Sequence, residues 1–231
     1  MNKIQIFRKI VQSLFFIYYV FLTSICLCFY GILEQVFLIG FSNEIQKLIV
    51  IGILTILLGR VFCGFMCPLG FLQEISYNLN PKNKKRIGDI PYHDKLKYIK
   101  YFVMVVFLIL TAYLSIYAFC KICPIGAVSN LYGTILSFII LFGVLIVSYF
   151  IPRCFCRYLC PLGAFLSILS HISIFRLKTN ENCVNCKLCE NKCPMRIKIV
   201  NNMDQKECVR CFECMSACKK NGLSFKPFFK K

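Results

Sequence analysis

The sequence has few charged residues, and acidic side chains are especially scarce. Only 16% of the 231 residues are charged, and ten of the residues are Asp or Glu, whereas 58% are apolar and the mean hydropathy is +0.67. A soluble domain needs more charge than this to cover its surface. The composition therefore excludes a soluble globular protein and indicates a membrane protein.

The sequence also lacks the features of a secreted protein. Lys3, Arg8 and Lys9 precede the first apolar stretch, as in a signal peptide. No small-residue cleavage site follows, so we expect that stretch to remain as an anchor. The 17 cysteines do not resemble a disulfide framework, because such scaffolds are short and polar and these thiols have metal-ligand spacings.

Four apolar stretches are candidate membrane spans. A bilayer core of about 30 Å needs roughly 20 residues of helix, and the candidates are residues 10–33, 45–62, 101–119 and 131–151. Of the 28 Lys and Arg residues, 26 lie before the first span, from Arg60 at the end of the second span to Lys100, or after the fourth span. By the positive-inside rule these segments are cytoplasmic, with both termini inside. Topology thus explains most of the net charge of +18, and no nucleic-acid partner is expected.

An internal repeat is visible within this membrane half. Residues 60–70 align without gaps on residues 153–163, at an offset of 93, and both segments read R-x-F-C-x3-C-P-L-G. The same offset brings the start of the first span close to that of the third. The sequence therefore predicts two copies of a two-helix unit, related by an axis along the membrane normal.

Each copy of the repeat ends in two cysteines and an arginine that share one helical face. Pseudo-symmetry would bring together four thiolates, with Arg60 and Arg153 nearby to favour the ionised form. Such a set suits an iron–sulfur cluster. The alternative is a group of unpaired buried thiols at helix ends. The four residues are Cys63, Cys67, Cys156 and Cys160; Cys154 has no counterpart and is treated as spare.

Four further cysteines are expected toward the opposite face of the membrane. Cys120 and Cys123 end the third span and precede Pro124. A second membrane cluster, a dithiol exchange site and simple packing are the alternatives, and we favour a redox role for this pair. Cys26 and Cys28 are spaced i, i+2, so they do not share a helical face, and packing explains them at least as well.

The tail from about residue 176 carries the strongest motif. It contains two runs of C-x2-C-x2-C-x3-C, and in this spacing three cysteines bind one 4Fe–4S cluster while the fourth binds its neighbour. One cluster is therefore assigned to Cys183, Cys186, Cys189 and Cys218. The other is assigned to Cys208, Cys211, Cys214 and Cys193. Structural zinc is a poor alternative, because its two C-x2-C pairs are separated by a longer gap.

The tail has too few large apolar residues to fold by hydrophobic burial alone. We therefore expect its two clusters to act as the folding core. It contains 13 Lys and Arg residues against five Asp and Glu. This charge could guide an acidic carrier such as a flavodoxin or ferredoxin, or bind anionic lipid and offset the charge of the clusters.

These motifs resemble the NapH-type membrane ferredoxins and the wider group that includes the membrane part of NosR and the CcoG maturation proteins. The resemblance covers nearly the whole chain. It implies an electron-transfer subunit, like that of a quinol dehydrogenase, working with partner subunits rather than as a self-contained enzyme. The Cys120–Cys123 pair departs from the NapH pattern, and the chain has no flavin-binding extension of the NosR type.

The predicted architecture is an all-α membrane domain of four helices with an internal repeat, residues 1–175, followed by a small α+β ferredoxin-like domain, residues 176–231. The chain is expected to relay electrons between a quinol or cytoplasmic donor and an acceptor in the membrane or at its outer face. The alternatives are a maturation or metal-reduction factor of the CcoG kind and a transmembrane dithiol reductase. A quinone is a further candidate cofactor, with His171 and Glu74 as residues that could exchange its protons.

Overall fold

The structure separates the chain into a helical part and a tail that contains the sheet. This computed structural model describes residues 3–21, 45–81, 93–114, 122–130, 134–200 and 203–227. The helices of the helical part are α1 (Lys3–Phe21), α3 (Ile45–Leu58), α4 (Val61–Phe65), α5 (Pro68–Leu79), α6 (His93–Leu96), α7 (Ile99–Leu114), α8 (Pro124–Asn130), α9 (Ile135–Phe150), α10 (Cys154–Tyr158) and α11 (Pro161–Ser170). The tail contains β1 (Phe175–Thr179), α12 (Leu188–Asn191), α13 (Glu213–Ala217) and β2 (Leu223–Pro227).

Each of the four predicted membrane spans contains a helix, namely α1, α3, α7 and α9. Among the described residues, only α1, with 19 residues, is long and apolar enough by itself to cross a membrane. The other three have 14, 16 and 16 residues, fewer than the roughly 20 that a bilayer core requires. Four membrane-crossing helices therefore remain a prediction.

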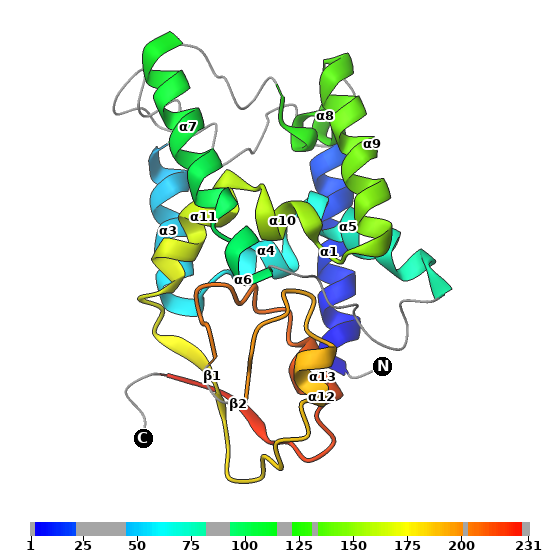
Figure 1. Ribbon diagram of the computed structural model, residues 1–231, viewed down its shortest axis with the longest axis vertical. Helices are drawn as coiled ribbons and strands as arrows, with labels where there is room; N and C mark the ends of the chain where they lie inside the picture. The colour runs from blue at the N-terminus through cyan, green and yellow to red at the C-terminus, as the bar shows by residue number, and fades with distance from the viewer. Residues whose placement is uncertain are drawn as a thin grey trace.

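The long helices form two groups with the short helices α4 and α10 between them (Figure 1). One group contains α1, α5, α8 and α9, and the other contains α3, α7 and α11. Within them, α5 packs against α1 and α9, while α11 packs against α7 and α3. Each C-P-L-G helix thus contacts one long helix from its own half of the sequence and one from the other half. These contacts between helices from different halves of the sequence hold the helical part together.

Two turns with the same backbone conformation join α4 to α5 and α10 to α11. Cys67 and Cys160 are extended, with φ of −68° and −71°, and the next helix begins at the proline that follows each of them. Proline is favoured at the first helical position because its missing N–H would have no partner there. The Cys160 Sγ accepts a hydrogen bond from the Gly163 backbone N–H at 3.2 Å. The turn therefore places a cysteine sulfur at each helix start.

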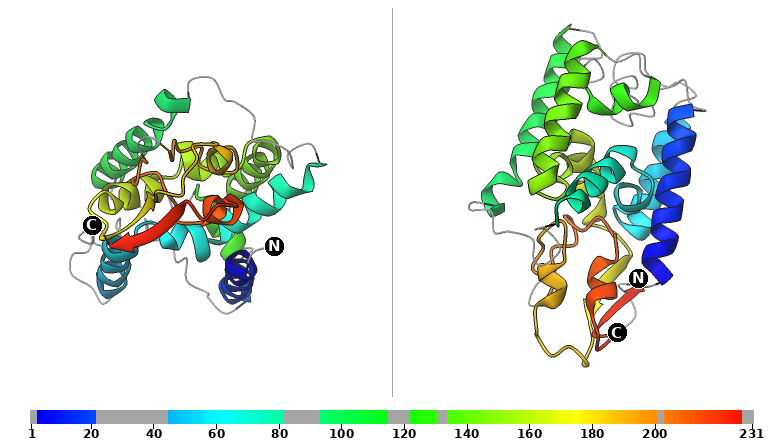
Figure 2. Two further views of the ribbon diagram at one scale, coloured as in Figure 1. Left: turned by 90° about the horizontal axis from the view of Figure 1, so that it is seen from below. Right: turned by 90° about the vertical axis from the view of Figure 1, so that its right-hand side faces the viewer.

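The tail has a ferredoxin-like arrangement in which a sheet joins its first and last segments. β1 pairs antiparallel with β2, with Leu177 opposite Phe225, and α12 packs against α13. The tail also lies directly against the helical part. The N-terminal end of α1 reaches it (Figure 2), where the Gln5 Nε2 donates a hydrogen bond to the Cys211 carbonyl oxygen at 3.0 Å. Both parts therefore form one packed unit.

The backbone of α4 lies directly against the backbone of the tail at Gly64. A Cβ atom at Gly64 would lie 2.3 Å from the carbonyl oxygen of Val209. Because the backbones of both α4 and the tail form this contact, neither can move aside as a flexible side chain could. Only glycine fits this contact.

We expect Gly64→Ala to destabilise the chain by about 1–3 kcal/mol, as overpacking does in a close-packed interior. The matched control is Gly143→Ala in α9, where a Cβ would meet nothing within 4 Å. Alanine is the better helix former by about 1 kcal/mol, so this control should be neutral or slightly stabilising. Thermal unfolding in detergent compares the two variants. Equal melting temperatures would show that the contact at Gly64 is not tight.

Candidate iron–sulfur sites

The tail cysteines gather into two separate sets in the structure. The distal cysteines surround a cavity of about 240 Å³ at the end of the tail. The proximal cysteines surround a smaller cavity next to the helical part. The distal set is Cys183, Cys186, Cys189 and Cys218. The proximal set is Cys193, Cys208, Cys211 and Cys214. These are the two sets that the spacing predicts, and their ligation of clusters is a proposal.

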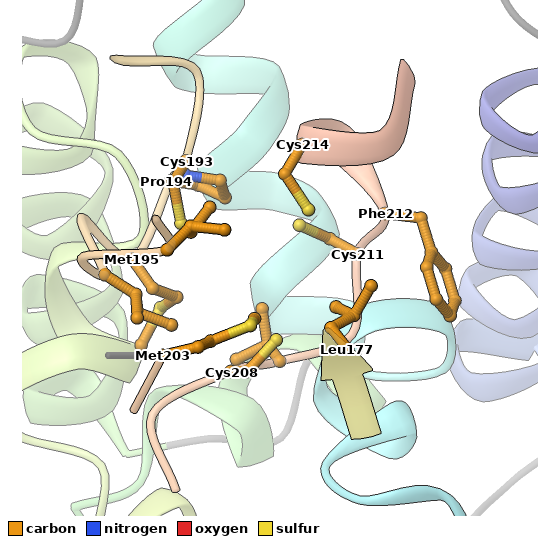
Figure 3. A pocket seen from close by; sticks show the side chains of 12 residues that line it. Leu177, Cys193, Pro194, Met195, Met203, Cys208, Cys211, Phe212 and Cys214 are labelled. Carbon is orange, nitrogen blue, oxygen red and sulfur yellow. The ribbon is translucent and has the colours of Figure 1, made fainter. Parts of the chain in front are cut away.

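The proximal cysteines lie in an apolar environment. Figure 3 shows their sulfur atoms facing a common hollow, beside Leu177, Met195 and Met203. Burial raises the pKa of the Cys211 thiol to about 12. Burial, together with the neighbouring cysteines, also raises the pKa of Cys214. These sulfur atoms therefore ionise readily only when a cation such as iron replaces the protons.

Unusual backbone conformations recur at equivalent positions in the two tail motifs. Six non-glycine residues of the tail have φ between 50° and 56°. They form three pairs at an offset of 25 residues, which also relates the two cysteine runs. The pairs are Asn185 with Arg210, Lys187 with Phe212, and Arg196 with Asn221. The left-handed region is costly for residues such as Lys, Arg and Phe. The loops therefore adopt a costly conformation that turns their cysteines inward.

The third set of thiols lies between the two helix groups. The membrane-side cysteines, Cys63, Cys67, Cys156 and Cys160, are at most 8% exposed. They are close enough to interact electrostatically: burial, with the charges of Cys156 and Cys63, raises the pKa of both Cys67 and Cys160. The structure thus brings together the four thiols that the repeat predicts.

Gln73 contacts this third set and was not identified from the sequence. Its Nε2 donates to the Cys156 Sγ at 3.4 Å, and its Oε1 accepts from the Phe155 backbone N–H at 3.2 Å. The residue at the same place in the second copy is Leu166, which is fully buried. The membrane-side site is therefore asymmetric, with an amide beside one cysteine and an aliphatic side chain at the equivalent place. No sequence signal marked Gln73, because Glu74, Ser76 and Asn78 follow it in the same helix.

An excess of buried positive charge surrounds the proximal and membrane-side cysteines. Among the described residues, six cations are at most 1% exposed, but only two carboxylates are buried, and the partly exposed Glu213 pairs with Arg8 at 2.7 Å, so three positive charges are in excess. The carboxylates are Glu74 and Glu207. The cations are Arg8, Arg60, Lys100, Arg153, Arg157 and Arg210. Unpaired buried charge is very costly, so this region requires anions.

The residues present fit two thiolate-bound clusters. A cubane with four thiolates carries a net charge of about −2 when oxidised, so two of them would supply enough negative charge to offset the excess. Several guanidinium N–H groups are buried without a hydrogen-bond partner among the described residues, including the Nε of Arg60, Arg157 and Arg210. Arg60 lies close to Cys63 and Cys160, and Arg210 close to Cys208. These donors suit cluster or thiolate sulfur atoms as acceptors.

A single metal ion fits these sites less well. Within the described ranges, no three Cys, His, Asp or Glu side chains converge closely enough to hold one ion. A cubane is larger than one ion, so its four thiolates stand farther apart.

Glu74 is fixed by cations at the boundary between the two parts. Arg8 contacts it at 3.1 Å, the Arg153 Nε donates to it at 2.9 Å, and Lys9 also pairs with it. Burial alone would raise the pKa of Glu74, but these charges outweigh burial and lower it to about 2. Glu74 therefore holds the interface as a paired carboxylate, and its role in proton exchange stays a prediction.

The remaining predicted residues are not part of these three sets. Cys123 is fully buried and precedes α8, which lies away from the tail in Figure 1. Its sequence neighbour Cys120 falls outside the described residues, as do Cys26 and Cys28. His171 is exposed and borders an open cavity beside the tail. The structure thus brings twelve of the predicted cysteines into sets of four.

Comparison with known protein families agrees with this arrangement. A family model described as a 4Fe-4S binding domain matches residues 47–86, 99–139 and 133–180. The three matches contain the cysteine–proline turns at Cys67, Cys123 and Cys160. The family signal therefore lies in the helical part and not in the two tail motifs.

Similar proteins occur in archaea and bacteria. An uncharacterized protein of Methanocaldococcus jannaschii is 61% identical over all of this chain and 99% of its own length. The putative electron transport protein YccM of Escherichia coli is 29% identical over 72% of this chain and half of its own length. The ferredoxin-type protein NapH of Haemophilus influenzae is 24% identical over 78% of this chain and 67% of its own. No solved structure matches. The chain belongs to the 4Fe-4S binding family of ferredoxin-type electron-transport proteins, the group that includes NapH.

Proposed function

We propose that the chain is a membrane-bound subunit that relays single electrons through three iron–sulfur sites. The observation that supports this most directly is the position of Arg153, whose charge acts on both Cys156 and Cys211. One side chain thus bridges the membrane-side and proximal cysteines. The sites follow one another along a single route, from the distal to the proximal to the membrane-side cysteines.

The twelve cysteines hold the proposed clusters. Two 4Fe–4S clusters are assigned to the distal and proximal cysteines, and a third to the membrane-side cysteines. When bound, these clusters supply one-electron oxidation and reduction. The protein contributes burial, which excludes water, and guanidinium groups, which stabilise the thiolates. We also propose a membrane domain of residues 1–175, which contains the membrane-side cysteines, and a ferredoxin-like domain of residues 176–231, which contains the distal and proximal cysteines.

An acidic electron carrier is the proposed partner at the distal site. Cys186 is exposed, and Val184 beside it is 64% exposed, so a protein can approach this site closely. Lys187, Lys219 and Lys220 line the same cavity. Lysines around an exposed redox centre favour encounter with a negatively charged partner such as a flavodoxin or ferredoxin.

The membrane position is proposed from the apolar surface of the long helices. Large apolar side chains are exposed along α1, α3, α7 and α9, for example Leu14, Ile53, Phe102 and Phe142. Exposed apolar bands of this extent suit contact with lipid. The tail and the start of α1 lie at the same end of the molecule (Figure 1), which agrees with cytoplasmic termini in a multi-pass inner-membrane protein.

A quinol is proposed as an alternative donor to a soluble carrier. An open cavity of about 490 Å³ lies between α7, α11 and the tail, within the size range of small-molecule sites. Tyr98, Tyr101 and His171 line it, together with Glu207, which precedes the proximal Cys208. The cavity combines aromatic and titratable side chains next to a proposed cluster.

Iron content and redox-titrated EPR of the anaerobically reconstituted chain test the proposal. We expect about twelve irons per chain and three cluster signals. Cys156→Ser should remove one signal and about four irons, because it deletes a ligand of the membrane-side site. Cys154→Ser is the matched control, since Cys154 is only half-buried and belongs to none of the three sets. About eight irons in the wild type, unchanged in both variants, would confine the clusters to the tail.

A further inference from the structure

The two copies of the cysteine turn differ at one position that carries charge. Glu74 lies 14 residues after Arg60, and the residue at the same place in the second copy is Ser167, 14 residues after Arg153. In the structure, Arg153 of the second copy pairs with Glu74 of the first. If the two copies behaved alike, Arg60 of the first copy would pair with residue 167 of the second. Ser167 has no charge to offer it.

A carboxylate from the tail occupies that place. The Glu207 Oε2 lies 3.5 Å from the Arg60 Nη1, and Glu207 also pairs with Lys100. The Ser167 Oγ donates to the Lys206 carbonyl oxygen at 3.0 Å and is 3.4 Å from the Glu207 Oε1. Glu207 thus stands where the side chain of a glutamate at 167 would reach.

Two buried cations of the helical part depend on this carboxylate. Arg60 and Lys100 are both 0% exposed, and Glu207 is the one carboxylate paired with them among the described residues. Removing one partner from a buried charge pair leaves the other charge uncompensated, which is strongly destabilising. If the tail separated from the helical part, Arg60 and Lys100 would therefore either become exposed to solvent or stay buried without a carboxylate partner.

We infer that Glu207 is a positioning residue that locks the tail onto the helical part by supplying the carboxylate missing from the second copy. The tail is then a fixed wall of the membrane-side site and not a mobile carrier on a tether. This inference goes beyond the proposed function, because it holds whatever the membrane-side cysteines bind.

Hydrogen exchange of the full-length chain, purified anaerobically in detergent, tests the lock. In Glu207→Gln we expect exchange at the backbone amides of residues 63–65 and 209–210 to rise about tenfold or more. Glu190→Gln is the matched control, since Glu190 accepts from the backbone N–H groups of Ile199 and Val200 inside the tail. It should loosen those tail amides and leave residues 63–65 unchanged.

A double variant that moves the carboxylate from position 207 to position 167 tests whether interface protection can be rescued. Glu207→Ser should open the interface, and adding Ser167→Glu should restore wild-type exchange to within about threefold, because the carboxylate then comes from the second copy. Iron content is measured in every variant. The inference is overturned if Glu207→Gln exchanges like the wild type, or if Glu207→Ser loses iron and interface protection together and Ser167→Glu restores neither.

Discussion

Removing iron from the purified chain should unfold the tail and expose its contact surface on the helical part, while the long helices such as α9 stay folded. In the described ranges 176–200 and 203–227, the tail has only a two-stranded sheet, whose first strand begins at Phe175, and two helices of four and five residues. Four of its left-handed residues are neither Gly nor Asn and cost about 1–2 kcal/mol each: Lys187, Arg196, Arg210 and Phe212. That cost is comparable with the whole stability of a small domain, about 5–15 kcal/mol. Metal–thiolate bonds are the interaction that can offset it.

Anaerobic chelation followed by hydrogen exchange measures this effect. We expect protection of residues 176–227 to fall about 100-fold or more, as in small domains that fold only with their metal. Peptides from α9 in the same sample serve as the internal control and should not change. Cys214→Ser should act in the same direction, and Met215→Leu next to it should not. A chelated tail that keeps its protection would mean that side-chain packing holds it.

Replacing Arg153 by methionine should have the second large effect, on both stability and redox potential. Its guanidinium is fully buried, pairs with Glu74 and donates to the Cys63 carbonyl oxygen at 3.0 Å. Loss of a buried partner costs about 3–5 kcal/mol. Loss of a cation beside the thiolates should also lower the reduction potential, by an amount on the order of 50–100 mV.

Thermal unfolding and redox titration of Arg153→Met separate these two effects. Lys226→Met is the control, because it removes a cation that is exposed on β2. Adding Glu74→Gln to Arg153→Met should lower the stability further, because Arg8 and Lys9 still pair with Glu74 when Arg153 is absent. A potential equal to that of the wild type would show that Arg153 is far from any redox centre.

The cysteine sets were predictable because their spacing carries local information. Two C-x2-C-x2-C-x3-C runs define the distal and proximal sets, and the 93-residue offset brings Cys63 and Cys67 to Cys156 and Cys160. Proline after Cys67 and Cys160 also marks the helix starts that the structure contains. The apolar stretches predicted the helices, although α3, α7 and α9 are shorter than the predicted spans.

The charge pairs around these sites were not predictable in the same way. Glu74 meets Arg153 across 79 residues, and Arg60 meets Glu207 across 147. The 93-residue repeat relates equivalent positions of its two copies, but it does not specify which residue of one copy meets a residue of the other copy or of the tail. Arg60 and Arg153 were recognised as neighbours of the cysteines, but their carboxylate partners depend on how the helices and the tail pack.

Cys193 of the first tail motif belongs to the proximal set, and Cys218 of the second motif belongs to the distal set. This arrangement determines how much of the chain must be synthesised before either set of four cysteines is complete. On the proposed assignment, the proximal set needs Cys214 and the distal set needs Cys218, so neither is complete until the ribosome has passed those codons. By then every helix from α1 to α11 has already been translated. Iron must therefore be delivered to a polypeptide whose hydrophobic segments have left the ribosome, so we expect the donor of assembled clusters to work at the lipid surface.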